Sequence, residues 1–331
     1  MLNGRKRTTA TLAALALTGT IALSVSASTT PAQAEPDIDT VRAKVDKLYH
    51  QAEQASERYN DAKVELTALK RDVGSLKADQ SRQGKQLDVV RGEVRDAIIQ
   101  SYQTGGLAAT GDLLSADSDA FLDRVSTQST IDDIQGALLD DYDTEIKAYS
   151  VRAGQTNSRL DEVADLEATL AKEKKTVDEK LADAKSLLSD LEAKEREAVL
   201  SRGGGRAPAL GSVPASGRAK AAVAYALAQV GDAYVYGAAG PNAFDCSGLT
   251  MMAWGQAGVG LPHSSSAQFG SGAHVARNAL QPGDLVFYYS PISHVGIYIG
   301  NGMIVHAANP GAGVKVSSVD EMPYSGAVRP G

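Results

Sequence analysis

The chain has only one cysteine, and it has no long apolar stretch after its first 34 residues. A single cysteine excludes a disulfide within the chain, although its first residues resemble those of exported proteins, in which thiols usually pair. A membrane-spanning helix needs roughly 20 apolar residues, so we expect none in the remainder of the chain. Cys246 therefore needs an explanation other than disulfide formation.

The first 34 residues have the pattern of a cleaved export signal. A basic start at residues 5–7 precedes a mostly small and apolar stretch from Ala10 to Val25, and residues 32–34 read Ala-Gln-Ala, a typical cleavage site. A membrane anchor is the other reading, but the apolar stretch contains several Thr and Ser and is shorter than a span. We expect cleavage after Ala34 and a secreted, extracytoplasmic protein.

A basic stripe that would favour nucleic acid is also missing. Residues 35–200 hold 23 Lys and Arg against 35 Asp and Glu, whereas residues 217–331 hold five of each kind. Acidic residues on a long helical segment usually form a solvated helix face. The sequence therefore predicts no nucleic-acid partner.

Residues 35–200 carry two runs of the heptad pattern that is typical of coiled coils. Glu167 and Lys174 occupy seam positions of the second run, so we expect weaker packing there, and the Gly-containing segment between the runs interrupts the helix. We predict an antiparallel helical hairpin with a small helical tip near 103–130, and an intermolecular coiled coil stays open as the alternative. The first run comprises Val41, Val45, Leu48, Ala52, Ala55, Tyr59, Ala62, Leu66, Leu69, Val73, Leu76, Leu87, Val90 and Val94, and the second extends from Leu160 to Leu191.

Residues 201–217 are rich in Gly, Pro and Ser and predict a flexible linker before a domain at 218–331. Apolar residues recur at helical steps just after Cys246, so this cysteine stands at the start of a helix, where Asp245 and Ser247 are candidate caps. The unpaired N–H groups of a helix start lower the pKa of a thiol and favour a nucleophile. The alternative is that Cys246 is a small buried apolar residue.

Two histidines lie on predicted strands downstream of the cysteine. A two-residue Asn301-Gly302 turn would pair Ile297 with His306 and place His306 on the apolar face. A three-residue loop would instead pair Gly296 with His306, which places His306 beside His294 on one face. The sequence permits both registers, and only the second favours a catalytic pair.

Four separated motifs in the last 110 residues resemble the NlpC/P60 peptidoglycan endopeptidases, which are papain-like cysteine peptidases. They read "YVYGAAGPNAFDCSGL", "LPHSSSAQ", "LQPGDLVFY" and "SHVGIYIGNGMIVHA". The resemblance implies an α+β fold with helices packed on an antiparallel sheet, preceded by the long coiled-coil hairpin. It implies hydrolysis of amide bonds in wall stem peptides, most often between D-glutamate and the following diamino acid, by a protein associated with the cell wall.

The resemblance also implies roles for individual residues. Cys246 matches the nucleophile, His294 the base, and His306 the polar residue that orients the base. We expect substrate contacts from the family tyrosine and from neighbours of these motifs, namely Tyr236, Asp245, Ser247 and His263. His263 stands where the family often has Arg, and Tyr236-Gly237-Ala238 replaces its aromatic-Gly-Gly motif, so contacts at the substrate ends can differ from those of the family. No cofactor is implied, because the histidines and the cysteine show no metal-ligand spacing.

The helical arm is similar to the hairpins of division-associated wall hydrolases, which dock on an ABC-transporter-like membrane complex. This resemblance implies regulation or partner docking through the coiled coil, and a lytic enzyme on a long arm suggests that the arm covers the cleft until a partner binds. Two other readings are open. One is a non-enzymatic scaffold that only holds the wall, and the other is transfer of the acyl group to an amine.

Overall fold

The structure is a computed structural model that describes residues 38–103, 118–191, 195–196 and 217–331. The predicted export signal, most of the predicted linker and part of the predicted tip lie outside these ranges. Among the described helices, none combines the length and apolar character that crossing a membrane requires.

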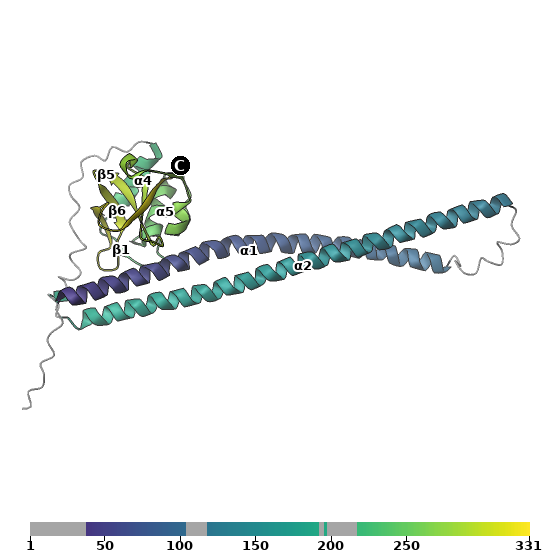
Figure 1. The fold of residues 1–331 in the computed structure, drawn as a ribbon, viewed down its shortest axis with the longest axis horizontal. Helices are drawn as coiled ribbons and strands as arrows, with labels where there is room; N and C mark the ends of the chain where they lie inside the picture. Colours follow the sequence, from purple (N-terminus) through teal and green to yellow (C-terminus); the bar gives the residue numbers. More distant parts are fainter. Residues whose placement is uncertain (1–37, 104–117, 192–194, 197–216) are drawn as a thin grey trace, which may run out of the picture. The chain divides into compact units, whose positions relative to one another are not determined.

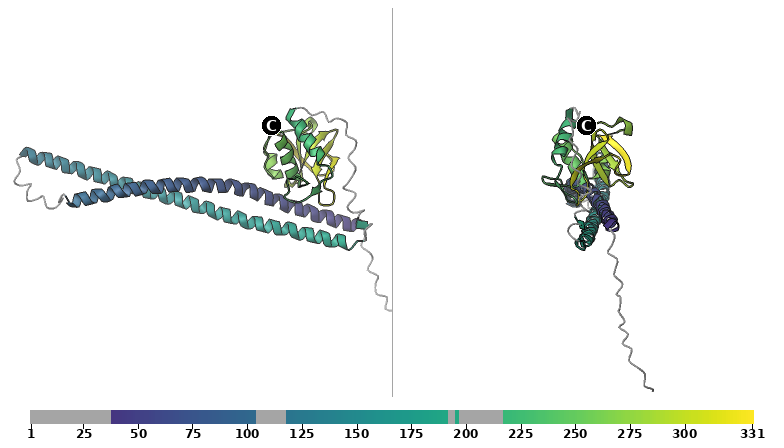
Figure 2. Two further views of the ribbon diagram at one scale, coloured as in Figure 1. Left: turned by 180° about the vertical axis from the view of Figure 1, so that it is seen from behind. Right: turned by 90° about the vertical axis from the view of Figure 1, so that its left-hand side faces the viewer.

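Two long helices form the hairpin, α1 (Ile38–Gln103) and α2 (Ser118–Ser189), and they lie side by side in every view (Figures 1 and 2). Polar contacts between them advance along α1 while they retreat along α2, which shows that the pairing is antiparallel. These contacts join Arg58 to Glu173, Lys70 to Glu167, Gln83 to Glu145 and Arg91 to Tyr142. The second helix begins at Ser118, well before the predicted second heptad run at Leu160.

The seam of the hairpin is better buried on α1 than on α2. Most apolar residues of the predicted first run are buried, whereas Glu167, at a predicted seam position of α2, is half exposed and pairs with Lys70. The charged residues at predicted seam positions of α2, Glu167 and Lys174, are therefore exposed to solvent. An apolar cluster lies at the open end of the hairpin and comprises Val41, Val45, Tyr49, Ala184, Leu188 and Leu191.

The carboxyl-terminal domain has a six-stranded antiparallel sheet with the strand order β3-β8-β4-β5-β6-β7. Helices α4 (Gly217–Ala228) and α5 (Cys246–Gln256) pack on one face of this sheet, over a buried apolar core that includes Phe287 and Ile297. This arrangement confirms the predicted α+β fold with helices on an antiparallel sheet. The remaining elements are β1 (Ala233–Tyr234), β2 (Ala243–Phe244), α6 (Ser265–Phe269), β3 (Ala273–His274), η1 (Arg277–Ala279), β4 (Leu285–Tyr288), β5 (His294–Gly300), β6 (Met303–Ala307), β7 (Val314–Ser318) and β8 (Tyr324–Arg329).

The β5–β6 hairpin has the register that brings the two histidines together. Ile297 lies opposite Val305, and this register continues to Gly296 opposite His306. The connection combines the two predicted possibilities, because a two-residue Asn301-Gly302 turn with positive φ is accompanied by a register shift between Tyr298 and Gly300. The shift restores the pairing that a simple two-residue turn would lose.

Candidate functional site: a buried cysteine and two histidines beneath a helix

The cysteine stands at the first residue of α5, as its sequence context predicts. Asp245 is the N-cap, and its carboxylate accepts hydrogen bonds from the backbone N–H of Gly248 at 2.6 Å and of Gly237 at 2.8 Å. These bonds fix the start of the helix and the loop that precedes it. Cys246 is thereby held at the amino-terminal end of α5, in contact with the main-chain N–H of Val295.

A chain of hydrogen bonds joins the two histidines to β7. The ring nitrogen Nε2 of His294 lies 2.7 Å from Nδ1 of His306, and Nε2 of His306 lies 2.9 Å from the hydroxyl of Ser317. Burial and the neighbouring charges of His294 and Lys315 lower the pKa of His306 well below its ordinary value. His306 is therefore a neutral ring that is hydrogen-bonded to His294.

Side chains of Cys246 and His294 lie close together, and a third group from α1 joins them. Glu53 Oε1 lies 2.5 Å from His294 Nδ1, and one polar atom from each of these three residues lies within 4.8 Å of the others. A carboxylate only accepts hydrogen bonds, so Nδ1 of His294 carries the proton of this bond. Burial raises the pKa of Glu53, but the charge and hydrogen bonds of His294 outweigh it and leave the pKa lowered.

The three residues also have the chemical types that bind zinc. Two ligands of a tetrahedral zinc site are about 3.3 Å apart, given zinc–nitrogen and zinc–oxygen bonds of about 2.0–2.1 Å. The 2.5 Å between Glu53 and His294 is too short for that arrangement and matches a charge-assisted hydrogen bond. Within the described part of the chain, the trio is therefore a hydrogen-bonded carboxylate–imidazole pair beside a thiol.

A second carboxylate from α1, Glu57, lies directly over the cysteine. It accepts hydrogen bonds from the Ser247 hydroxyl at 2.8 Å and from the Ser265 main-chain N–H at 2.5 Å. Its Oε1 is 3.7 Å from the sulfur of Cys246. Burial and the nearby charge of Asp245 raise the pKa of Glu57 to about 7.

The thiol does not have the lowered pKa that a helix start predicts. Burial raises the pKa of Cys246 well above its ordinary value, and the charges of Glu57, Glu53 and Asp245 add to this effect. Two of these three carboxylates belong to α1. The prediction of an activated thiol is therefore wrong for this conformation, because a helix of the arm covers the cysteine and no local sequence feature reveals that contact.

The four residues predicted to contact substrate lie around the start of α5, where Cys246 stands. The Tyr236 hydroxyl donates to the main-chain oxygen of Tyr49 on α1 at 2.9 Å, and Ser247 bonds Glu57 as described above. The ring of His263 lies 2.8 Å from the Asp245 carboxylate, and this contact raises its pKa although burial opposes the shift. His263 therefore pairs with the cap of α5 and has no contact with the histidine chain.

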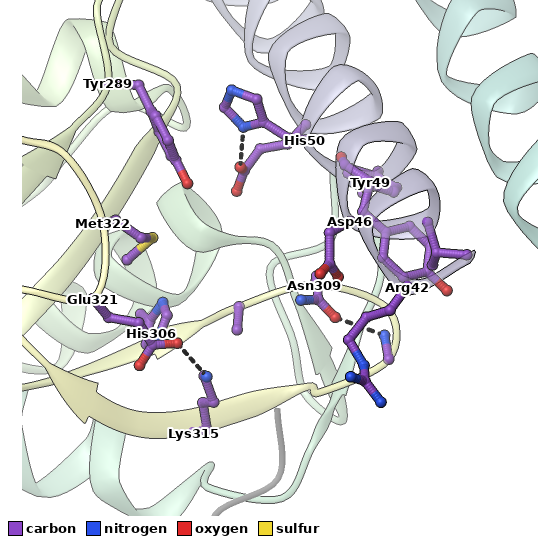
Figure 3. A pocket seen from close by; sticks show the side chains of 15 residues that line it. Arg42, Asp46, Tyr49, His50, Tyr289, His306, Asn309, Lys315, Glu321 and Met322 are labelled. Carbon is purple, nitrogen blue, oxygen red and sulfur yellow. Dashed lines mark hydrogen bonds and ion pairs between the residues drawn. The ribbon is translucent and has the colours of Figure 1, made fainter. Parts of the chain in front are cut away.

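A cavity of about 290 Å³ remains beside His306, between α1 and the domain. Figure 3 shows Arg42, Asp46 and His50 of α1 on one side of this cavity, facing Tyr289, Lys315 and Glu321 of the domain. Lys315 and Glu321 form an ion pair at 2.6 Å, and the ring of His50 lies 4.2 Å from that of Tyr289. The helix thus covers the cysteine but does not fill the whole cleft.

Sequence reasoning missed Glu53, Glu57 and Asp61 because acidic residues are ordinary on the polar face of a heptad helix. One signal was available, since these residues and Tyr49 recur at steps of four along α1. That spacing marks one helix face, but it does not reveal which surface the face meets.

Part of this chain is similar to known proteins. Residues 231–328 match the NlpC/P60 family. A probable endopeptidase of Corynebacterium glutamicum is 46% identical over 123 residues, which are 37% of this chain and 59% of that protein. A probable endopeptidase of Mycobacterium tuberculosis is 51% identical over 106 residues, which are 32% of this chain and 28% of that protein.

Among solved structures, the NlpC/P60 domain of the peptidoglycan hydrolase SagA is 36% identical. The match covers 33% of this chain and 97% of that one, with a TM-score of 0.32. In both curated relatives the match spans less than two thirds of the protein. The carboxyl-terminal domain of this chain belongs to the NlpC/P60 family.

Proposed function

We propose that this chain is a secreted, cell-wall-associated peptidoglycan endopeptidase that uses Cys246, His294 and His306. The observation that carries the proposal is the buried hydrogen-bond chain from His294 through His306 to Ser317, next to a cysteine at a helix start. A nucleophile, a base and an orienting group in this order are the elements of covalent amide hydrolysis.

In the proposed reaction, the thiol of Cys246 gives its proton to His294, and the resulting thiolate attacks the carbonyl carbon of the scissile amide. Backbone N–H groups at the start of α5 stabilise the oxyanion. The C–N bond breaks as His294 returns the proton to the leaving amine, and water then hydrolyses the thioester and regenerates the thiol. His306 keeps the ring of His294 in the productive orientation.

The substrate is a stem peptide of the wall, cleaved between D-glutamate and the following diamino acid. Support comes from the family of the domain and from relatives that are named probable endopeptidases. The groups that would contact this peptide are Tyr236, Asp245, Ser247 and His263, which surround the cysteine.

Mass spectrometry of the products from defined muropeptides tests both the activity and the bond. The assay uses the full chain and also the full chain with Glu53→Ala and Glu57→Ala, because these carboxylates contact His294 and Cys246. We expect fragments ending in D-glutamate, and none when Cys246→Ala or His294→Ala is added to either version. Products that persist without Cys246 would refute the mechanism, and binding to wall without any product would favour a non-enzymatic scaffold.

The hairpin serves regulation and partner docking in cell division or wall remodelling, and its partner is an ABC-transporter-like membrane complex. Support comes from large apolar side chains that stay exposed toward the end of the hairpin away from its open end, among them Ile98, Ile99 and Leu139. Replacing these three residues with Ser should weaken chemical cross-linking of the protein to membranes prepared from the cells that produce it. Replacing three exposed polar residues of the hairpin with Ser, as a control, should not.

A further inference from the structure

One face of α1 contacts the candidate site at every turn from Tyr49 to Asp61. Tyr49, Glu53, Glu57, Asn60 and Asp61 recur at short helical intervals, so they share one side of the helix. We call these five residues the latch stripe. A different side of the same turns carries the heptad seam with α2, so α1 is held between two surfaces.

Groups of the domain that would act on a substrate are already bonded to the latch stripe. Glu53 bonds His294, Glu57 bonds Ser247 and the Ser265 N–H, and Asp61 accepts from the Ser266 hydroxyl at 2.6 Å. The amide of Asn60 lies 3.2 Å from the Asp245 carboxylate. Cys246 and His294 are each only 1% exposed beneath these contacts, so no peptide reaches them.

We propose that the latch stripe is a built-in inhibitor of the cysteine site, and that the site opens only when α1 leaves it. This inference rests on the proposed function, because it assigns a regulator to the same site. The latch stripe blocks access of a peptide to Cys246. Two of its carboxylates also oppose the proton transfer from Cys246 to His294.

Glu53 makes the proposed base, His294, unavailable. Nε2 of His294 bonds His306, so Nδ1 is the one ring nitrogen left to take the thiol proton, and Glu53 bonds that atom. Glu57 acts on the nucleophile, because a carboxylate 3.7 Å from the sulfur opposes formation of the thiolate. With α1 in place, neither partner of the first proton transfer is available.

The contact is also built to be reversible. Burying the Glu57 carboxylate carries a desolvation cost that its hydrogen bonds only partly offset, so its contact stabilises docking less than an apolar contact of equal size would. The cavity beside His306 shows that α1 does not fill the cleft. The contact of Glu57 and the unfilled cleft both favour release of α1 when a partner pulls on the hairpin.

The single cysteine allows a test that needs no wall substrate. The rate at which iodoacetamide alkylates Cys246 is measured in the full chain, in Glu53→Ala/Glu57→Ala, and in a control with the exposed α1 residues changed, Glu65→Ala/Asp72→Ala. Asn60→Trp is a second opening variant, because an indole has no space at a side chain that is 2% exposed. Circular dichroism checks that each variant keeps its helices.

We expect both opening variants to react at least about tenfold faster than the wild-type chain and the control, since an accessible, less perturbed thiol reacts faster. Endopeptidase activity should rise in parallel. Equal alkylation rates in all folded versions, or a wild-type thiol as reactive as a free one, would overturn the latch. Faster alkylation without any hydrolysis would support the latch and count against the proposed function, so the two failures are distinguishable.

Discussion

At the level of single residues, hydrogen bonds join the two histidines of the site to each other and to Ser317. His306 contacts His294 on one side and Ser317 on the other, and its pKa is lowered by burial, so it holds the base through a neutral hydrogen bond. Its contribution to the proposed catalysis comes from orientation, which is smaller than that of the nucleophile.

Replacing His306 tests this role in the Glu53→Ala/Glu57→Ala background. His306→Ala should lower kcat by roughly 10- to 150-fold, the equivalent of about 1.5–3 kcal/mol for one hydrogen bond to a charged group. His306→Asn should recover part of the loss, because an amide can bond the same nitrogen of His294. Full activity in His306→Ala, measured by fragment release at saturating muropeptide, would make this residue structural.

Residue types and spacing make Cys246, His294 and His306 candidates, and the resemblance to the NlpC/P60 family singles them out. The structure brings these three side chains together. Their catalytic roles stay predictions. The pKa of the thiol is the property that local sequence does not supply. A helix start is a local feature, whereas the burial and the carboxylates that reverse its effect come from residues about 190 positions away.

At the level of elements, the heptad runs predict the two helices of the hairpin, and the Gly-Asn-Gly turn allows the register of β5 and β6. The start of α2 at Ser118 does not follow from the predicted second run, which begins only at Leu160. Covering of the cleft by the arm is expected, but the face of α1 that docks on the domain is not predictable. Its acidic face looks the same in sequence whether it meets water or a binding cleft.

The latch should respond to pH through Glu57. Its pKa is about 7 when docked and close to its ordinary 4.5 when released, so the docked form binds more protons. The contribution of Glu57 to docking is complete below about pH 4.5 and is lost as the pH rises through about 7. Glu53 has the opposite sign, since its lowered pKa makes its contribution fade only at acidic pH, below the window of interest.

Several charged or titratable groups surround Glu57, namely Asp245 and Cys246 of α5, Glu53 of its own helix, and His263. The control variant Glu57→Gln keeps these groups and removes only the titrating carboxylate. We expect the ratio of the wild-type to the Glu57→Gln alkylation rate to rise with pH, by up to about tenfold per unit between about pH 5 and pH 7. A ratio that does not change with pH would show that Glu57 does not control docking.

At the level of the whole molecule, the seam residues of α1 pack against α2 of the same chain. Its cross-helix polar contacts and its apolar cluster at the open end pair α1 with α2 of the same molecule. An intermolecular coiled coil, which the heptads alone allow, would have to replace these contacts. We therefore expect sedimentation equilibrium to give the mass of a monomer at micromolar concentration, and a stable dimer mass would contradict the intramolecular hairpin.

The hairpin thus links two tasks, since α1 packs on α2 through one side and covers the cysteine site through another. Removing the contact at the site should not unfold the hairpin, because the seam lies on a different face. In the proposed account, this separation allows a partner that binds the hairpin to control the candidate active site without any change inside the carboxyl-terminal domain.

The rate of fragment release from purified peptidoglycan, compared among three full-length versions of the chain, decides whether this protein is a latched enzyme. They are the wild type, Glu53→Ala/Glu57→Ala, and Glu53→Ala/Glu57→Ala/Cys246→Ala. We predict slow release by the first, release at least about tenfold faster by the second, and none by the third. Equal release by the first two, or continued release by the third, would contradict a latched cysteine endopeptidase.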